Sequence, residues 1–252
     1  MRTRQLRSGQ FGPHTDESRR IIVTYALTQN ILQQVSKKIH YAMTRRLSHP
    51  ALLEAVGALS EQDDDLARIA ATYGPPPLWE RDQGFHTLVH IILEQQVSLA
   101  SAKAAYDRLV AAVDRLTPVN FLQLGDTRLK QIGFSRQKTL YGRELAMAVI
   151  NGSLDLTGLD RLGDKDARAH LMQVKGIGTW TADIYLLMVL RRPDIWPRGD
   201  LALEIAIQRV KGWTRRPTPD EAREISESWR PWRAVAARLL WHFYLSERKA
   251  PA

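Results

Sequence analysis

Apolar side chains recur at helical spacing along most of the chain after residue 48. In the stretch 85–99, for example, Phe85, Leu88 and Ile92 fall on one side of a helix. No stretch shows the strict alternation of polar and apolar residues that is typical of a strand. The pattern therefore predicts an all-α protein with many short helices, over residues 51–58, 65–72, 85–99, 101–113, 137–150, 165–174, 180–190, 201–210 and 220–245.

Proline-rich stretches and the first residues interrupt this pattern. The prolines of 75–77 and the stretch 215–219 predict breaks between helices. Residues 1–20 are polar, with few large apolar groups, and predict a disordered arm, whereas 21–47 can form an amphipathic helix. No apolar run approaches the roughly 18–20 residues that a membrane helix needs, so no contact with a membrane is expected.

Charge and the missing cysteines narrow the possible partners and chemistry. The net charge is +9, but residues 1–49 hold nine Lys and Arg against two acids, so the rest of the chain is close to balanced. This charge favours nucleic acid as a partner, although a solvated basic tail explains it equally well. The chain contains no cysteine, which excludes disulfides, thiolate zinc sites, cysteine nucleophiles and iron–sulfur clusters held by cysteine.

The most informative segment is 171–183, where one predicted helix ends and another begins across Gly176-Ile177-Gly178. Glycine permits backbone conformations that other residues resist, and amides at a helix start can bind a phosphate. Thr181 stands where a dinucleotide-binding motif has its third glycine, and no strand precedes it, so that fold is disfavoured. Taken alone, the segment is equally consistent with a plain tight turn between two helices.

The surrounding residues favour the first interpretation. The sequence of 171–182 resembles the helix-hairpin-helix motif, at about 165–190, of the base-excision DNA glycosylases. A Gly/Pro-rich loop, 193–199, follows and leads to Asp200, which lies twenty residues after Trp180 as in that family. Residues 94–98 resemble the Gln-Gln-x-Ser segment of the family. The stretch 229–233, followed by Trp241, resembles the C-terminal signature of the DNA-3-methyladenine glycosylase II branch, so the resemblance spans roughly residues 50–252.

This resemblance implies two helical subdomains flanking a DNA-binding cleft. One subdomain is expected to combine 49–84 with 205–252, and the other to comprise 85–204 with the hairpin and Asp200. Residues 1–48 are expected to be a basic, partly disordered N-terminal extension.

The hairpin also distinguishes between the two chemistries of the family. Bifunctional members carry a lysine at the position of Trp180, and its amine attacks the sugar to give a Schiff base. Lys175 lies before the turn and does not match, so a monofunctional hydrolase is expected. The resemblance implies that Asp200 is the catalytic carboxylate, which stabilises positive charge on the sugar and orients or activates water. Asp200 also precedes a predicted helix and can cap it, and the two roles are compatible.

Aromatic residues are expected to bind the extruded base. A purine alkylated at N3 or N7 is positively charged, and indole faces attract such a base. The match places Trp180 and Trp241 in this base pocket, whereas Ile184 stands where the branch often has a further aromatic residue. The remaining tryptophans that we considered are expected to be structural, and these are Trp79, Trp213, Trp229 and Trp232.

The same match assigns the remaining contacts with DNA. Gln95 and Gln96 are expected to fill the hole that base flipping leaves, with Gln96 as the better candidate for intercalation, although a solvated pair at a helix end is the alternative. The DNA backbone is expected to meet the amides of Gly176, Gly178 and Trp180, with Lys138 and Arg136 as weaker candidates. No cofactor is required. The family implies a structural Na⁺ or K⁺ in the hairpin, held by the carbonyls of Met172, Val174 and Ile177.

The sequence thus predicts a glycosylase for alkylated purines, of the 3-methyladenine and 7-methylguanine type, acting in base excision repair. Its expected partner is damaged double-stranded DNA, which it meets as a monomer. The expected location is cytoplasmic and nucleoid-associated, or nuclear in a eukaryote. The alternatives are a glycosylase for another lesion class, a non-catalytic DNA-binding module and a helical protein-interaction domain. Asp200 argues against a pure DNA binder, because a carboxylate repels a phosphate-rich partner.

Overall fold

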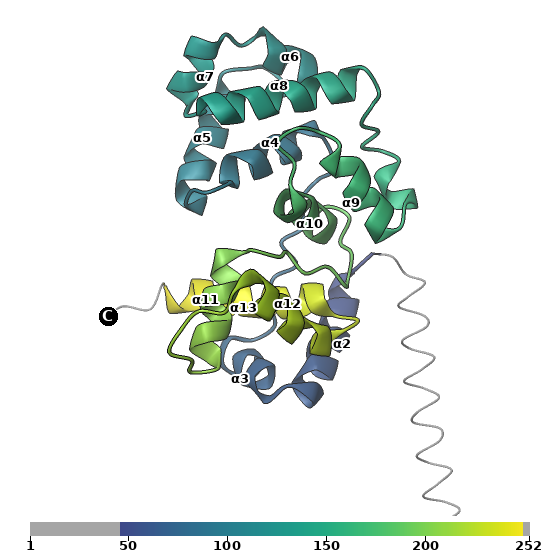
Figure 1. Ribbon diagram of the computed structural model, residues 1–252, viewed down its shortest axis with the longest axis vertical. Coiled ribbons are helices and arrows are strands. Elements are labelled where there is room, and N and C mark those ends of the chain that lie inside the picture. Colours follow the sequence, from purple (N-terminus) through teal and green to yellow (C-terminus); the bar gives the residue numbers. More distant parts are fainter. Residues whose placement is uncertain (1–45, 249–252) are drawn as a thin grey trace, which may run out of the picture. The chain divides into compact units, whose positions relative to one another are not determined.

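The computed structural model describes residues 46–248, and every regular element within that range is a helix (Figure 1). The all-α fold class is therefore confirmed. The expectations for residues 1–45, a disordered arm and an amphipathic helix, lie outside the described residues. The helices are α2 (His49–Gln62), α3 (Asp64–Tyr73), α4 (Phe85–Glu94), α5 (Leu99–Ala111), α6 (Pro118–Gln123), α7 (Asp126–Ile132), α8 (Arg136–Ile150), η1 (Leu159–Arg161), α9 (Asp164–Met172), α10 (Thr179–Met188), α11 (Leu201–Val210), α12 (Pro219–Ser226), η2 (Glu227–Trp229) and α13 (Arg233–Glu247).

Polar residues at the helix starts explain where many of these elements begin. Ser48, Ser98 and Ser135 each accept a hydrogen bond from an amide in the first turn of α2, α5 and α8. Thr218 and Glu221 form a reciprocal capping box at α12. The predicted breaks at 75–77 and 215–219 are confirmed, and α11 has the bounds that the apolar spacing predicts.

Two predicted helices are wrong in their extent, and two short α-helices were missed, as was the single turn η1. The helix predicted over 85–99 ends at Glu94, because Gln96 adopts a left-handed backbone (φ 58°) and Ser98 caps a new helix. The helix predicted over 220–245 is divided by η2 and Pro231, which has no amide hydrogen to donate. The missed helices, α6 and α7, are too short to establish a clear apolar period.

The helices that lie around α13 come from both ends of the described chain. Residues 234–241 of α13 are buried without a break, and α13 packs against α2, α3 and α11. The middle of the chain forms another set of packed helices, in which α4 packs against α5, α8 and α10, and α9 packs against α10 (Figure 1). The expected division into 49–84 plus 205–252 and 85–204 stays a prediction, and its boundary at 204/205 falls inside α11.

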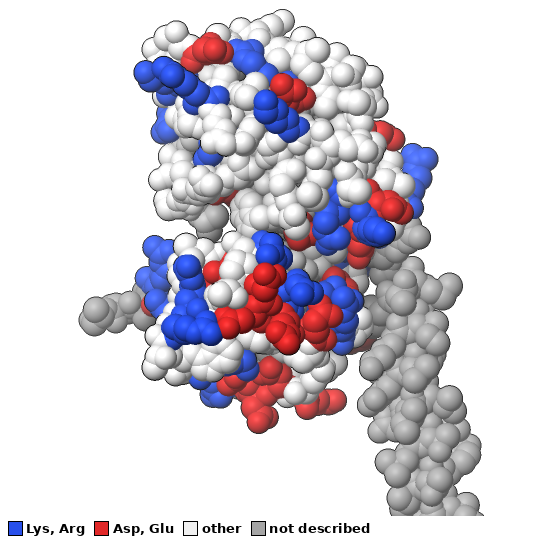
Figure 2. Space-filling view, viewed as in Figure 1, with Lys and Arg blue, Asp and Glu red and all other residues white. Residues whose placement is uncertain are grey.

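Many charged side chains of the described residues form ion pairs with one another. On the face shown in Figure 2, basic and acidic groups lie side by side rather than in a patch of one sign. Arg230 and Arg233 both bind Asp194 and Glu227, at 2.7–2.9 Å. Within residues 46–248, no helix is long and apolar enough to cross a membrane.

Candidate functional site

Asp200 lies at the junction between the 193–199 loop and α11. Gly199 has a left-handed backbone (φ 82°), which turns the chain so that Asp200 becomes the cap of α11. The Asp200 Oδ1 atom accepts a hydrogen bond from the Leu203 amide at 3.0 Å. Asp200 is only 9% exposed, so its carboxylate needs hydrogen-bond donors from the protein in place of water.

The structure brings the two predicted pocket tryptophans to this carboxylate. Trp180, in the first turn of α10, donates from Nε1 to Asp200 Oδ2 at 2.9 Å. Trp241, in α13, donates from Nε1 to Asp200 Oδ1 at 3.1 Å. Three helices therefore meet at one carboxylate group. The Trp180 side chain is half-buried, whereas Trp241 is buried and 7% exposed.

This arrangement leaves Asp200 with unused acceptor capacity. A carboxylate offers about four acceptor sites. Oδ1 receives the Leu203 amide and Trp241, and Oδ2 receives Trp180, so the donors described here occupy three of those sites. Donors on three sides fix the orientation of the carboxylate and match its negative charge, and Oδ2 can still accept a hydrogen bond from a water molecule.

A second buried acid follows one helical turn later. Glu204 lies on α11, four residues after Asp200, and sequence reasoning did not single it out. Burial raises the pKa of Glu204, and the negative charge of Asp200 raises it further. The Arg216 guanidinium, whose Nε lies 3.4 Å from Glu204 Oε2, lowers this pKa and so opposes the effect of burial. The i, i+4 spacing from Asp200 is the sequence signal that could have identified it, because residues four apart share one helix face.

The helix-hairpin-helix consists of α9, the turn 173–178 and α10, and we call residues 173–178 the hairpin turn. Gly176 has φ 97°, and a Cβ atom there would overlap the ring of Tyr141. Gly178 precedes α10 and has no side chain, so no side-chain hydrogen bond caps the start of that helix. Glycine is thus required by the fold at Gly176.

An ion pair joins the two helices of the hairpin. Arg168 in α9 donates from Nε to Asp183 Oδ1 in α10 at 2.6 Å. Burial raises the pKa of Asp183 from 3.8 to about 6, and the Arg168 charge only partly opposes this effect. The sequence motif gave no indication of this pair.

The residues between α4 and α5, 95–98, form what we call the wedge turn. Gln95 donates from Nε2 to Gly176 O and to Thr181 Oγ1, both at 2.9 Å, and so connects this turn to the hairpin. Gln96 is exposed and has the left-handed backbone described above. Val97 and Leu99 are exposed apolar neighbours, at 46% and 58%. The two glutamines, which the sequence grouped together, therefore differ in environment.

The predicted basic and carbonyl contacts lie near the same two turns. Lys138 donates from Nζ to Leu93 O at 2.7 Å, at the end of α4, and burial lowers its pKa. Arg136 is exposed. The Val174 carbonyl accepts the Ile177 amide at 3.0 Å within the hairpin turn. Among residues 46–248, no group of three or more His, Cys, Asp or Glu side chains is arranged to hold a metal ion.

The other tryptophans divide into buried and accessible ones. Trp229 and Trp232 are buried. Trp79 is half-buried, and its ring meets the Trp241 ring edge to face, with centroids 6.4 Å apart, so it belongs to the surroundings of Asp200. The sequence analysis expected Trp79 to be structural, because its only local signal is an aromatic residue after a proline run.

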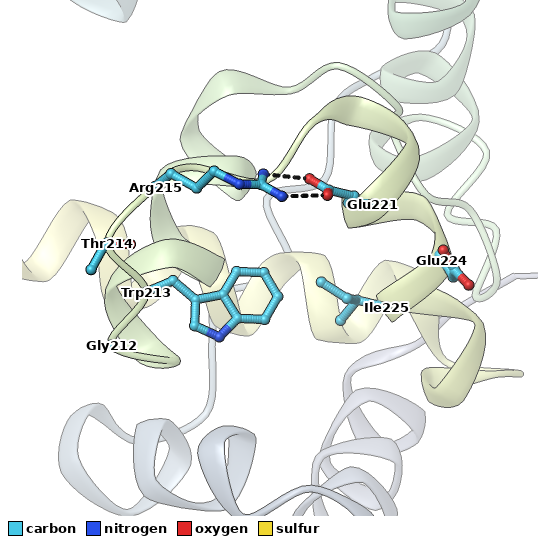
Figure 3. A pocket seen from close by; sticks show the side chains of 7 residues that line it. All are labelled: Gly212, Trp213, Thr214, Arg215, Glu221, Glu224 and Ile225. Carbon is cyan, nitrogen blue, oxygen red and sulfur yellow. Dashed lines mark hydrogen bonds and ion pairs between the residues drawn. The ribbon is translucent and has the colours of Figure 1, made fainter.

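Trp213 does not fit its expected structural role, because 42% of its side chain is exposed. It lines a hollow of about 610 Å³ beside the α11–α12 connection (Figure 3). In this hollow Arg215 forms a two-pronged ion pair with Glu221, at 2.6 and 2.8 Å. None of Asp200, Trp180 and Trp241 lines it, so this hollow is separate from the candidate active site.

Comparison with known proteins gives a consistent result. Residues 89–231 match the family model described as "HhH-GPD superfamily base excision DNA repair protein". A DNA-3-methyladenine glycosylase of Bacillus subtilis is 31% identical over 169 residues, which cover 62% of this chain and 56% of that protein. The chain thus spans little more than half the length of this relative. DNA-3-methyladenine glycosylase 1 of Schizosaccharomyces pombe is 26% identical over 74% of this chain and 83% of its own.

Solved structures show the same likeness. A Schizosaccharomyces pombe 3-methyladenine DNA glycosylase in complex with abasic DNA superposes with a TM-score of 0.70 at 26% identity, covering 75% of this chain and 95% of that one. A DNA-3-methyladenine glycosidase from Bacillus halodurans has a TM-score of 0.62 at 27% identity, over 78% of this chain and 91% of that one.

Proposed function

The chain belongs to the HhH-GPD superfamily of base excision DNA repair proteins, and from this membership we propose that it is a monofunctional DNA glycosylase for alkylated purines. Its substrates are bases of the 3-methyladenine and 7-methylguanine type, and it hydrolyses the N-glycosidic bond. The observation that carries the proposal is the buried Asp200 carboxylate, held by the indoles of Trp180 and Trp241. The relatives named as 3-methyladenine glycosylases support the substrate class.

Asp200 supplies the negative charge that this reaction needs. As the base departs, positive charge develops on the sugar, and a fixed carboxylate stabilises it without having to reorganise. The remaining acceptor site on Oδ2 orients the water that attacks the sugar and receives its proton. An alkylated purine already carries positive charge and leaves readily, so the mechanism requires no acid at the base.

The absence of a suitable amine at the hairpin supports hydrolysis without strand cleavage. Trp180 stands where a Schiff-base lysine would be, and its indole binds Asp200 instead. Lys175 is exposed and lies before the glycines of the hairpin turn. The half-buried face of Trp180 is available to stack on an electron-poor base.

The two turns provide the contacts with the duplex. The amides of Gly176, Gly178 and Trp180 receive a phosphate, because the start of α10 has no side-chain cap and its dipole favours an anion. Gln96 enters the space left by the extruded base, since its side chain is exposed. Gln95 is held by Gly176 and Thr181, so it braces the wedge turn against the hairpin rather than intercalating.

A monovalent cation in the hairpin turn is compatible with the donors that this turn offers. Carbonyl oxygens are hard ligands of the kind that Na⁺ and K⁺ prefer. The Val174 carbonyl uses one lone pair for the Ile177 amide and keeps the other, and Met172 and Ile177 would supply the remaining carbonyls. Such an ion would stiffen the turn that receives the phosphate. The proposed chemistry requires no cofactor.

The partner that we propose is damaged double-stranded DNA, bound by a monomer. The substrate places the activity at the chromosome, in the nucleoid of a bacterial cytoplasm or in a eukaryotic nucleus. Because the chain spans little more than half of a named relative, the lesion range is also part of this proposal.

Release of free base from methylated DNA tests the proposal, with Asp200→Asn as the matched variant. Asparagine caps a helix as well as aspartate does, but its NH2 group cannot accept the indole hydrogen bond of Trp180. Thermal unfolding therefore checks that the variant folds, and its binding to DNA should persist. We expect excision to fall by roughly 10²–10³-fold, because the charge at the sugar is lost. Strands should remain uncut until alkali is added. Undiminished release by Asp200→Asn would remove Asp200 from the mechanism, and no release by the wild type would overturn the activity.

A further inference from the structure

Trp79 has an unusual backbone for a bulky residue. Its φ is +45°, in the left-handed region, which is an outlier for any large side chain. Such conformations persist only where the surroundings enforce them, and they cluster at functional sites. The positive φ of half-buried Trp79 therefore suggests that its ring has a functional role.

The residues on either side of Trp79 show how this backbone is enforced. The Leu78 carbonyl accepts Nε of Arg238, a fully buried guanidinium, at 2.9 Å. The Glu80 carboxylate binds Arg191 at 2.6 Å, and the Arg81 amide donates to Met188 O at 3.1 Å. The backbone of Trp79 is thus held by contacts on both sides.

The ring of Trp79 lies against Trp241, which donates a hydrogen bond to Asp200. Trp79 packs edge to face on Trp241, and also on His242, with centroids 6.4 and 6.3 Å apart. Trp241 is buried and its N–H is used by Asp200. Trp241 therefore presents little surface to a base, whereas Trp79 is partly open to solvent beside it.

We propose that Trp79 forms a wall of the base pocket and supplies a stacking face for the extruded base, while buried Trp241 positions Asp200. This inference rests on the proposed glycosylase function. Trp79 is a specificity-determining residue in this view, since an indole face favours cationic, electron-poor bases over ordinary ones.

The test uses Trp79→Asn, with Trp79→Phe as the conservative variant. Asparagine tolerates a left-handed backbone, so the first variant removes the ring without adding strain. The matched control is Trp213→Asn, which removes an exposed tryptophan from the hollow away from Asp200. Each variant is compared with the wild type in single-turnover release of 7-methylguanine, and in affinity for a duplex with an abasic-site analogue, which offers no base to stack on.

We expect Trp79→Asn to lose roughly tenfold or more in base release, in line with base–aromatic stacking, while its affinity for abasic DNA stays within about twofold. Trp79→Phe should recover much of the rate, and Trp213→Asn should match the wild type. Equal release by Trp79→Asn and the wild type overturns this inference and leaves the glycosylase intact. An equal loss of release and abasic binding also overturns it, since that pattern indicates a structural role. If the wild type releases no methylated base, the proposed function fails first.

Discussion

The hairpin turn and the wedge turn are both short connections between helices, yet they are built in opposite ways. In the hairpin turn, Val174 and Ile177 are buried, and Gly176 fits closely against Tyr141. In the wedge turn, Gln96 and Val97 are exposed. One connection is therefore closely packed, whereas the other leaves its side chains exposed to a partner. A rigid turn suits a fixed phosphate contact, whereas exposed side chains suit entry into a distorted duplex.

The strongest test of the rigid half is Gly176→Ala. The added methyl group meets the Tyr141 ring and forces an alanine to φ 97°, so we expect a stability loss of about 3 kcal/mol or more. Binding to undamaged DNA should weaken at the same time. Denaturant unfolding and salt-dependent DNA binding measure the two effects.

Gly57→Ala is the matched control, because Gly57 lies within α2 with no atom within 4 Å of an added Cβ. This substitution should raise stability by roughly 0.5–1 kcal/mol. If Gly176→Ala unfolds like the control and binds DNA like the wild type, the hairpin turn is not the rigid partner.

A second test concerns buried Asp183, which pairs with Arg168 between the two helices of the hairpin. The pKa of Asp183 is raised from 3.8 to about 6, so the folded protein holds this proton more tightly than the unfolded chain does. This contribution to stability is complete below pH 3.8 and is lost as the pH rises through about 6. Asp183→Asn cannot ionise and does not lose this contribution. The stability of the variant relative to the wild type should therefore rise by roughly 2–3 kcal/mol as the pH increases from about 4 to 7.

Thermal or denaturant unfolding of both proteins across this pH range gives the difference directly. Asp107→Asn serves as the control, because Asp107 pairs with Lys103 on the surface of α5. A stability difference between wild type and Asp183→Asn that does not change with pH would contradict the assignment.

The smallest expected effects separate the two glutamines. Gln96→Ala should keep its stability and lose about tenfold in base excision, because the exposed side chain acts only within the duplex. Gln95→Ala should lose about 1 kcal/mol of stability, since its bonds to Gly176 and Thr181 disappear. Excision assays and unfolding on the same preparations distinguish the two. The reverse pattern would exchange their roles.

Local sequence signals predicted the hairpin, the start of α11 and the family. These signals can be read directly because the two glycines, the helix cap and Asp200 all lie within thirty residues of one another. The sequence could not separate Gln95 from Gln96, because their difference depends on where α4 ends. It could not place Trp79 beside Trp241, since ring contacts between distant segments arise only from packing. Trp213 shows the converse, because no local pattern indicated that its side chain is exposed.

Arg238 links the segments that carry the three indoles around Asp200. Its guanidinium donates to Leu78 O beside Trp79, to Leu187 O in α10, which carries Trp180, and to Ala234 O in α13, which carries Trp241. A single buried side chain therefore joins the three segments on which these tryptophans lie. Loss of this side chain would loosen the segments that carry all three tryptophans together, so their contacts with Asp200 and with one another should weaken at once.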